Sequence, residues 1–231
     1  MKTQAIIPSA GTGSRLNIKQ DKPLVLLNGK PLFIYSLLAI EKVPQVNSVI
    51  LVANKKHLKV FEQFIKKFKL KKVKRIVAGG ATRCASVKKA LAVLDADTEV
   101  IMIHDGARPF IKPALIAHAV SLMNRESAVV VGVPVKPTIK KVDSNNFYVE
   151  ETLPRETLWE IQTPQIFRKE ILLKAHELMP EKNPTDDAVL VEKMGVKVKM
   201  VMGDYRNIKI TTQEDLAIAR MFLNLKENPS E

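Results

Sequence analysis

Cysteine, tryptophan and long apolar runs are scarce in this chain of 231 residues. Cys84 is its one cysteine, so no intramolecular disulfide can form, and the chain suits a reducing compartment such as the cytoplasm. No apolar run approaches the roughly 18 residues that a membrane-spanning helix needs, and the N-terminal residues lack the apolar core of a secretory signal. These absences exclude a disulfide-stapled secreted domain, and we expect no membrane partner.

Acidic residues are outnumbered: 24 aspartates and glutamates stand against 37 lysines and arginines, giving a net charge of +13. Much of the excess lies in residues 55–75, where Glu62 is the only acid. Four apolar residues of this stretch recur at helical spacing: Leu58, Phe61, Ile65 and Phe68. We interpret the stretch as an amphipathic helix whose lysines face solvent; the alternative is a surface that attracts anionic ligands. Without zinc-finger spacing or an aromatic RNA-binding signature, we expect no nucleic-acid partner.

Apolar β-rich runs alternate with helical patterns through most of the chain. The runs that predict strands are residues 5–7, 46–52, 73–78, 100–103, 128–133, 196–201 and 208–210. The patterns that predict helices are residues 31–40, the basic stretch, 86–94, 114–123, 170–178, 186–194 and 212–225. Short connections between strand and helix are typical of an α/β protein, with a mainly parallel sheet covered by helices on both faces. We expect residues 1–231 to form a single domain.

The alternation is interrupted between Pro134 and Ile161. Two short segments rich in β-branched or aromatic residues, 136–142 and 147–149, flank the polar residues 143–146, which predicts a hairpin. An isolated hairpin is marginally stable, so it usually packs on something else. We expect residues 134–156 to form an arm that contacts a dimer partner.

The loop after the first predicted strand carries Gly11, Gly13 and Arg15, and Lys22 follows it. Glycine lets the backbone pass close to a ligand, and the amide groups of such a turn can bind phosphate oxygens. Two cations nearby favour a nucleoside triphosphate. The spacing fits neither a dinucleotide-binding GxGxxG nor a Walker loop, and a purely structural turn would explain the glycines equally well.

Other candidate residues follow further predicted strands. Asp105 comes after residues 100–103, and Gly79 and Gly80 come after residues 73–78. Because ligands bind at the carboxyl ends of the strands in open parallel sheets, we expect these residues on one rim with the first loop. A single carboxylate beside phosphates is a common way to hold Mg²⁺, although a turn aspartate would also explain Asp105. No Ser-His-Asp or Cys-His set predicts covalent catalysis.

Together these segments resemble a known family, the 2-C-methyl-D-erythritol 4-phosphate cytidylyltransferases of isoprenoid precursor synthesis. The segments that carry the resemblance are residues 8–15, Lys22 with 29–31, 79–83 with Ser86, 104–109, Trp159 with 162–165, 185–186 and 207–211. They occur in the family's order between about Thr3 and Leu223. Any one of them alone would be weak support.

The resemblance implies a Rossmann-like nucleotidyltransferase fold, a homodimer, and a Mg²⁺-dependent reaction of CTP with 2-C-methyl-D-erythritol 4-phosphate in the non-mevalonate pathway. It also implies a cytoplasmic enzyme, or one of the plastid stroma in a processed organellar form. Arg15, Lys22 and Lys209 would be catalytic, with Arg15 and Lys22 on the triphosphate, and Asp105 would bind the metal. The nucleotide-binding residues would be Ala10, Gly11, Gly13, Gly80, Ala81 and Ser86. The residues around the acceptor or the reacting phosphoryl group would be Arg108, Thr138, Arg155, Thr163 and Thr185, some of them from the partner's arm.

Some positions depart from the family pattern, and two rival functions stay open. Lys136 and Pro137 stand where an acidic residue usually precedes the threonine, which makes the role of Thr138 less certain. The nearer rival is a ribitol 5-phosphate cytidylyltransferase, which shares the fold and the CTP site. The more distant rival is a basic nucleic-acid-binding domain without catalysis.

Overall fold

The computed structural model describes residues 1–11, 13, 16, 21–178 and 184–227. Its main sheet has seven strands in the order β11-β7-β10-β6-β1-β4-β5. These strands are β1 (Thr3–Ser9), β4 (Val46–Ala53), β5 (Val73–Ala78), β6 (Val100–Ile103), β7 (Ala128–Pro134), β10 (Trp159–Arg168) and β11 (Lys199–Met202). Only β10 runs antiparallel to its neighbours within this sheet, so the predicted mainly parallel α/β architecture is confirmed.

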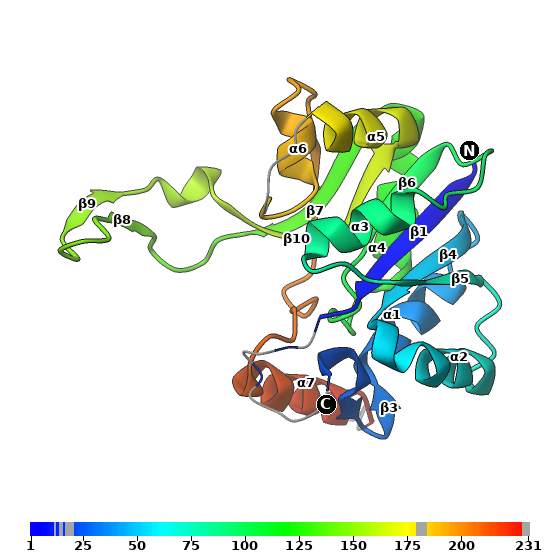
Figure 1. Ribbon diagram of the computed structural model, residues 1–231. Coiled ribbons are helices and arrows are strands. Elements are labelled where there is room, and N and C mark those ends of the chain that lie inside the picture. The colour runs from blue at the N-terminus through cyan, green and yellow to red at the C-terminus, as the bar shows by residue number, and fades with distance from the viewer. Residues whose placement is uncertain (12, 14–15, 17–20, 179–183, 228–231) are drawn as a thin grey trace.

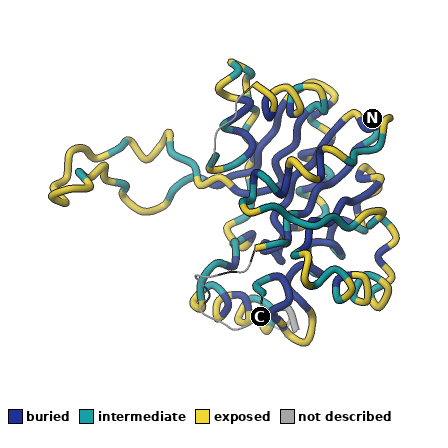
Figure 2. Tube along the Cα trace, viewed as in Figure 1, coloured by how far each residue is buried: buried dark blue, intermediate teal, exposed yellow. Residues whose placement is uncertain are grey.

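Helices cover both faces of the sheet (Figure 1). On one face lie α1 (Leu32–Glu41), α2 (Leu58–Lys67) and α4 (Pro113–Ser121), and on the other α3 (Arg83–Leu91), α5 (Lys169–Leu178) and α6 (Ala188–Glu192). Successive strand residues point to opposite faces, so Ile7 packs under the first set of helices and Ile6 under the second. Two buried layers result, with β1, β4, β6 and β7 almost wholly dark in Figure 2 and the edge strand β5 only partly buried.

A third apolar cluster holds the C-terminal segment against the loops that follow β1. Here α7 (Gln213–Glu227) packs Leu216 and Ala219 against Val25 and Leu27, near the small β2–β3 ladder (Leu26–Leu27 and Lys30–Pro31). Ile210 is buried in the same cluster, and its N–H donates to the carbonyl of Ala107 over 2.9 Å. This packing brings residues 207–210 to the carboxyl end of the sheet, where they lie beside segments that are distant in the sequence.

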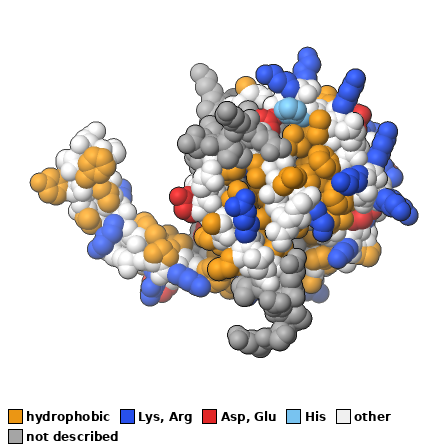
Figure 3. All heavy atoms as spheres, turned by 90° about the horizontal axis from the view of Figure 1, so that it is seen from below, with side chains coloured by type: hydrophobic (Ala, Val, Ile, Leu, Met, Phe, Trp, Pro, Cys, Tyr) orange, Lys and Arg blue, Asp and Glu red, His pale blue; other side chains and the backbone are white. Residues whose placement is uncertain are grey.

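The basic helix was predicted correctly. Lys59, Lys66 and Lys67 of α2 are exposed, whereas Phe61 is buried. A short 3-10 turn, Lys55–His57, precedes α2. Lys and Arg side chains are numerous on the side of the molecule away from the arm, where acidic side chains are few (Figure 3).

The arm consists of a two-stranded ladder, β8 (Lys140–Val142) with β9 (Val149–Thr152), and the 3-10 turn Arg155–Thr157 (Figure 1). It projects from the end of β7 and returns into β10, and nearly all of it is exposed (Figure 2). The tip carries apolar side chains: Phe147 is 81% exposed and Tyr148 75%. The predicted hairpin is therefore present, although its first strand is shorter than the predicted 136–142 and its second begins at the end of the predicted 147–149.

Three sequence-based expectations need correction. Residues 208–210 form no strand, and the Ile210 N–H donates to the carbonyl of Ala107 in a loop. The helix expected at residues 86–94 begins at Arg83, because the Thr82 hydroxyl caps it by accepting from the Ala85 N–H (3.1 Å). Strand β10 was not predicted, since Pro164 interrupts its pattern; the ladder to β7 shifts register between Ile161 and Gln165. The Thr163–Pro164 peptide bond is cis.

Within the described residues no helix combines the length and apolarity that crossing a bilayer requires.

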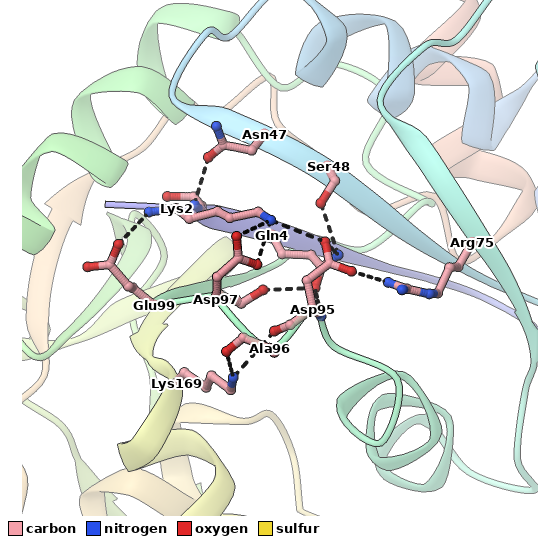
Figure 4. Close-up of polar contacts among 12 residues, drawn as sticks. Lys2, Gln4, Asn47, Ser48, Arg75, Asp95, Ala96, Asp97, Glu99 and Lys169 are labelled. Carbon is pink, nitrogen blue, oxygen red and sulfur yellow. Dashed lines mark hydrogen bonds and ion pairs between the residues drawn. The ribbon is translucent and has the colours of Figure 1, made fainter.

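The amino-terminal edge of the sheet is fixed by a polar network centred on Gln4 of β1 (Figure 4). The fully buried amide of Gln4 donates to Ser48 Oγ (2.9 Å) and to the Asp95 carboxylate (3.1 Å). Its oxygen accepts from the Asp95 N–H (3.0 Å) and from the Thr98 hydroxyl (3.1 Å). Asp95 also pairs with Arg75 of β5. One side chain thus ties β1, β4 and the loop before β6 together, at the end of the sheet opposite the cavities described below.

We therefore expect Gln4→Leu to destabilise the protein. The change keeps the volume but leaves buried donors and acceptors without partners, at about 1–3 kcal/mol for each such group. The free energy of unfolding from urea titration should fall by about 2–4 kcal/mol. Asp97→Asn, on the exposed rim of the same network, is the control and should leave the urea midpoint unchanged. An unchanged midpoint in Gln4→Leu would contradict the importance of this network.

Candidate active site

Two adjoining cavities open at the carboxyl ends of the sheet strands. The larger, about 520 Å³, lies among the loops after β1, β4 and β5, and we call it the loop cavity. The smaller, about 300 Å³, lies beside β10 and the segment before α6, and we call it the β10 cavity. Arg83, Asp105 and Lys209 line both of them. The two cavities therefore meet at one cluster of charged groups.

Close backbone approach shapes the loop cavity. A Cβ at Gly79 would lie 2.3 Å from Ala10 Cβ, and one at Gly80 would lie 2.6 Å from Ala85 Cβ, so neither position admits a side chain without movement. The Gly80 N–H donates to Ser86 Oγ over 3.0 Å. Gly13 has a φ of +73°, and a Cβ there would lie 2.5 Å from Lys22 Cβ. The glycines thus bring main chain and Lys22 close to the space that a ligand would fill.

Asp105 follows β6 directly and lies between two cations. Its Oδ2 is 2.6 Å from Lys209 Nζ and its Oδ1 is 3.1 Å from Arg83 Nε. Burial alone would raise the pKa of the Asp105 carboxyl, but Arg83 and Lys209 hold that pKa far below its usual range. The carboxylate is therefore ionised at neutral pH, and it is the anionic centre of the cluster.

His104 is held in one hydrogen-bonding state behind this cluster. Its Nε2 lies 3.4 Å from the Arg108 carbonyl, which can only accept, so Nε2 carries the proton and Nδ1 accepts from the Thr163 hydroxyl (3.0 Å). Thr163 Oγ1 in turn accepts the Asp105 N–H (3.1 Å). Burial lowers the pKa of His104 to about 4. A fully buried, neutral imidazole of this kind orients Thr163 and is not placed to take a proton from a ligand.

Arg108 supplies the buried cation of the β10 cavity. Its guanidinium donates to the carbonyls of Asn207 (2.7 Å) and Ile161 (3.3 Å), and burial lowers its pKa. Among the residues that the structure describes, Arg108 Nε finds no hydrogen-bond partner. Asn207 Nδ2 donates to Gln162 Oε1 (3.1 Å) and to the Thr163 carbonyl (3.0 Å). These contacts fix the segment that carries Lys209 against β10.

The structure brings most of the predicted site residues together. The loop cavity is lined by Ala10, Gly11, Lys22, Gly80, Ala81 and Ser86, the β10 cavity by Arg108, Thr163 and Thr185, and both by Asp105 and Lys209. Gly13 lies beside Lys22. Arg15 falls outside the described residues. Thr138 and Arg155 are exposed on the arm and line neither cavity; the Arg155 guanidinium donates to the Lys136 carbonyl (2.9 Å).

The sequence reasoning missed several lining residues. Arg83 belonged to a segment that carried the family resemblance but received no role, and Lys55 was treated as part of the basic stretch without a place in the site. Gln162, Gln165 and Asp186 also line the β10 cavity. The side-chain amide of Gln165 donates to Asp186 Oδ2 over 2.7 Å. The signal for Arg83 was its position just after a glycine pair, in the first turn of a helix.

The site fits a Mg²⁺ ion held by few protein ligands. Within the described ranges no group of three His, Cys, Asp or Glu residues is placed to hold a metal. Asp105 is an ionised carboxylate at the point where the two cavities meet. Mg²⁺ commonly binds one or two carboxylates and completes its octahedron with substrate phosphates and water, which suits this donor set.

Comparison with known proteins agrees with these observations. The family model described as IspD, 2-C-methyl-D-erythritol 4-phosphate cytidylyltransferase, matches residues 3–225. A cytidylyltransferase of that name from Caldanaerobacter subterraneus is 43% identical over 226 residues, covering 96% of this chain and 99% of the relative. One from Alkaliphilus metalliredigens is also 43% identical, over 230 residues that cover 98% of this chain and 95% of the relative. The crystal structure of the 4-diphosphocytidyl-2C-methyl-D-erythritol synthase of Anaerococcus prevotii superposes with a TM-score of 0.86 at 32% identity, covering 96% of each chain.

The sheet topology and the cavities at its carboxyl edge define an enzyme of the α/β nucleotidyltransferase class. Within that class the chain belongs to the 2-C-methyl-D-erythritol 4-phosphate cytidylyltransferase family. The resemblance inferred from the sequence motifs is confirmed.

The depressed pKa of His104 predicts a pH dependence of stability. The unfolded chain protonates this histidine below about pH 6.5, whereas the folded chain does so only near pH 4. Protons therefore favour the unfolded chain in this window, and stability falls as pH is lowered through it. The free energy of unfolding should drop by about 3 kcal/mol between these pH values. The carboxylates with depressed pKa values lose their contributions only below about pH 4.

Urea unfolding at closely spaced pH values measures this effect. His104→Gln, which does not titrate, should show a flatter dependence between pH 6.5 and 4. If that variant keeps the wild-type slope, the slope comes from another group.

Proposed function

We propose that this chain transfers CMP from CTP to 2-C-methyl-D-erythritol 4-phosphate in a Mg²⁺-dependent reaction of the non-mevalonate isoprenoid pathway. The products would be 4-diphosphocytidyl-2-C-methyl-D-erythritol and pyrophosphate. The observation that carries the proposal is the meeting of two cavities at Arg83, Asp105 and Lys209. A reaction that joins two anionic substrates needs two neighbouring sites with fixed cations between them.

The chemistry requires charge compensation rather than proton transfer. An oxygen of the acceptor phosphate would attack the α-phosphorus of CTP, the bond from that phosphorus to the bridging oxygen would break, and pyrophosphate would leave. The attacking phosphate monoester is already anionic at neutral pH, so no general base is needed. The neutral, fully buried state of His104 agrees with this. Positioning and fixed cations then supply most of the rate enhancement.

The loop cavity would hold CTP. Main-chain groups around Gly80 and Ala81 and the hydroxyl of Ser86 line this cavity and offer donors and acceptors for the edge of a cytosine base. Lys22 lines this cavity, and the proposal assigns it, with Arg15, to the triphosphate. The remaining members of the proposed nucleotide site are Ala10, Gly11 and Gly13.

The β10 cavity would hold the acceptor. The guanidinium of Arg108 lines this cavity, and it could bind the acceptor phosphate through its charge. Thr163 and Thr185 add hydroxyls at the cavity wall, and Lys209 is placed between this cavity and the other. Lys209 would therefore neutralise charge on both reacting phosphates.

Asp105 is the residue that would bind Mg²⁺, which when bound would neutralise the triphosphate and polarise its α-phosphoryl group. Lys209 and Arg83 keep this carboxylate ionised and directed at the shared edge of the cavities.

The arm would complete the site of a second copy of the chain. Thr138 and Arg155 lie on an exposed arm and far from the cavity linings of their own chain. The arm tip exposes Phe147 and Tyr148, apolar groups that a partner would cover. We propose a homodimer in which each arm brings Arg155, with Thr138, to the acceptor cavity of its partner.

Pyrophosphate release from CTP tests the function. With Mg²⁺ present, 2-C-methyl-D-erythritol 4-phosphate should support release, and ribitol 5-phosphate should support little. Lys22→Ala should lower kcat by about 100- to 1,000-fold because the developing charge loses a fixed partner. Lys56→Ala, on the exposed 3-10 turn before α2, is the matched control and should leave kcat unchanged.

Faster release with ribitol 5-phosphate would favour the rival cytidylyltransferase. Salt-dependent retention on RNA or DNA together with no nucleotidyl transfer would favour the nucleic-acid-binding alternative.

Mixed dimers test whether Arg155 acts in the partner's site. Arg155→Ala and Lys209→Ala homodimers should each be nearly inactive. A mixed dimer contains one Arg155→Ala subunit and one Lys209→Ala subunit. The Arg155→Ala subunit keeps its own Lys209 and would receive the intact arm of its partner, so one of the two sites would be complete. Co-expression with two tags and purification of the mixed dimer should therefore restore about half of the wild-type activity. If Arg155 acts in its own chain, no site is intact and the mixed dimer stays inactive.

A further inference from the structure

Arg83 connects the shared edge of the two cavities to a carboxylate buried behind it. Its Nε donates to Asp105 Oδ1 (3.1 Å) and its NH1 donates to Asp187 Oδ2 (2.6 Å). The side chain is about a quarter exposed (26%), because it lines both cavities. One guanidinium thus spans two carboxylates that lie on different elements.

Asp187 is the fixed end of this connection. Its side chain is 1% exposed, and its second oxygen lies 3.2 Å from His176 Nε2. Its own N–H donates to Gln165 Oε1 of β10 (3.2 Å), and it directly precedes α6 without a side-chain capping bond. Among the described residues, Asp187 therefore contacts α3, α5 and β10 through Arg83, His176 and Gln165.

A buried carboxylate carries a desolvation cost that an ion pair often fails to recover, so stability alone is a weak reason for Asp187. Fixing the orientation of Arg83 is a better reason. A guanidinium is a planar fork whose separate N–H groups bind different partners in fixed directions, which a lysine cannot reproduce. With Asp187 on NH1, the direction of Nε toward Asp105 is determined.

We propose that Arg83 is a positioning residue, held by Asp187, that orients the Asp105 carboxylate at the junction of the two cavities. Lys209 holds Oδ2 from one side and Arg83 holds Oδ1 from the other, so the carboxylate cannot rotate freely. The inference rests on the proposed function, in which Asp105 would bind the metal of the CTP complex. Arg83 acts through Asp105 and needs no direct contact with a substrate.

Two variants test this role. Arg83→Lys keeps the positive charge but cannot reach both carboxylates at once, and kcat should fall by about 10- to 100-fold. The KM values for CTP and for the acceptor should change less than about threefold, because the loss appears in the transition state. Asp187→Asn leaves Arg83 unchanged but weakens its anchor, and kcat should fall by about 3- to 10-fold.

A binding measurement provides a readout that does not depend on turnover. Mn²⁺ can replace Mg²⁺ as a probe, and its binding to the enzyme with CTP is followed by water-proton relaxation. The Kd for Mn²⁺ should rise by about 3- to 10-fold in both variants, in the same order as the losses of kcat. If the wild type transfers nothing to 2-C-methyl-D-erythritol 4-phosphate, the proposed function fails, yet this titration still tests the role of Arg83.

Matched controls come from the Arg75–Asp95 pair at the opposite edge of the sheet (Figure 4). Arg75→Lys and Asp95→Asn make the same chemical changes far from the cavities and should leave kcat and the Mn²⁺ Kd at wild-type values. Circular dichroism and thermal melting establish that each variant is folded. If Arg83→Lys does not fold, Asp187→Asn carries the test by itself.

Three results would overturn the proposal. If Arg83→Lys keeps the wild-type kcat and Mn²⁺ affinity, Arg83 contributes only its positive charge and does not orient Asp105. A raised KM with unchanged kcat would make it a substrate contact. If kcat is lost in Arg83→Lys but unchanged in Asp187→Asn, Asp187 does not hold Arg83 in its working orientation.

Discussion

The carboxylate of Asp105, held between Arg83 and Lys209, is the contact on which the arrangement of the site depends. Its three members come from the first turn of α3, the end of β6 and the segment before α7. A carboxylate this deeply buried is stable in its ionised form only with cations beside it. The charge requirement therefore fixes where three distant segments must meet, and the two cavities form on either side of that point.

The two ends of the sheet use polar groups differently. At the amino-terminal edge, the side-chain amide of Gln4 makes all its hydrogen bonds within the protein (Figure 4). At the carboxyl edge, the charged side chains of Arg83, Asp105 and Lys209 line two open cavities. This polarity follows from the α/β architecture, because the loops at the carboxyl ends diverge and leave a crevice. The proposed chemistry needs such a crevice, since it depends on placing cations rather than on moving protons.

Much of the sheet could be predicted because its central strands are buried on both faces. Residues 100–103 form a central, fully buried strand with the predicted boundaries, since continuous apolar runs are typical of parallel strands. Residues 73–78 also form a strand with the predicted boundaries, although this edge strand is only partly buried. Strand β10 escaped prediction because Gln162, Thr163 and Pro164 interrupt its apolar pattern to form a cavity wall. The residues that line a site break the regularity from which secondary structure is inferred.

Site residues could be predicted from the sequence only where they belong to a recognisable motif. Gly11 and Gly13 indicated a turn, and Asp105 indicated a rim position, but spacing gives no distance between residues 83, 105, 187 and 209. Those contacts exist because α3, β6, α6 and the segment before α7 pack at one end of the sheet. Arg83 therefore had no visible role in the sequence, although it touches both carboxylates in the fold.

The arm has features that one chain alone does not explain. Its hairpin pattern was readable, yet its two candidate site residues, Thr138 and Arg155, lie outside the cavities of their own chain. A two-stranded ladder with an exposed aromatic tip has little to stabilise it alone. In the proposed homodimer, contact with the partner would stabilise the arm by covering its tip. The same contact would bring the cation of Arg155 to the partner's acceptor cavity. The body of each subunit would then bind the nucleotide beside Asp105, while recognition of the acceptor would depend on assembly. A monomer should accordingly keep its CTP site and lose its acceptor site, so binding of the two substrates need not be lost together.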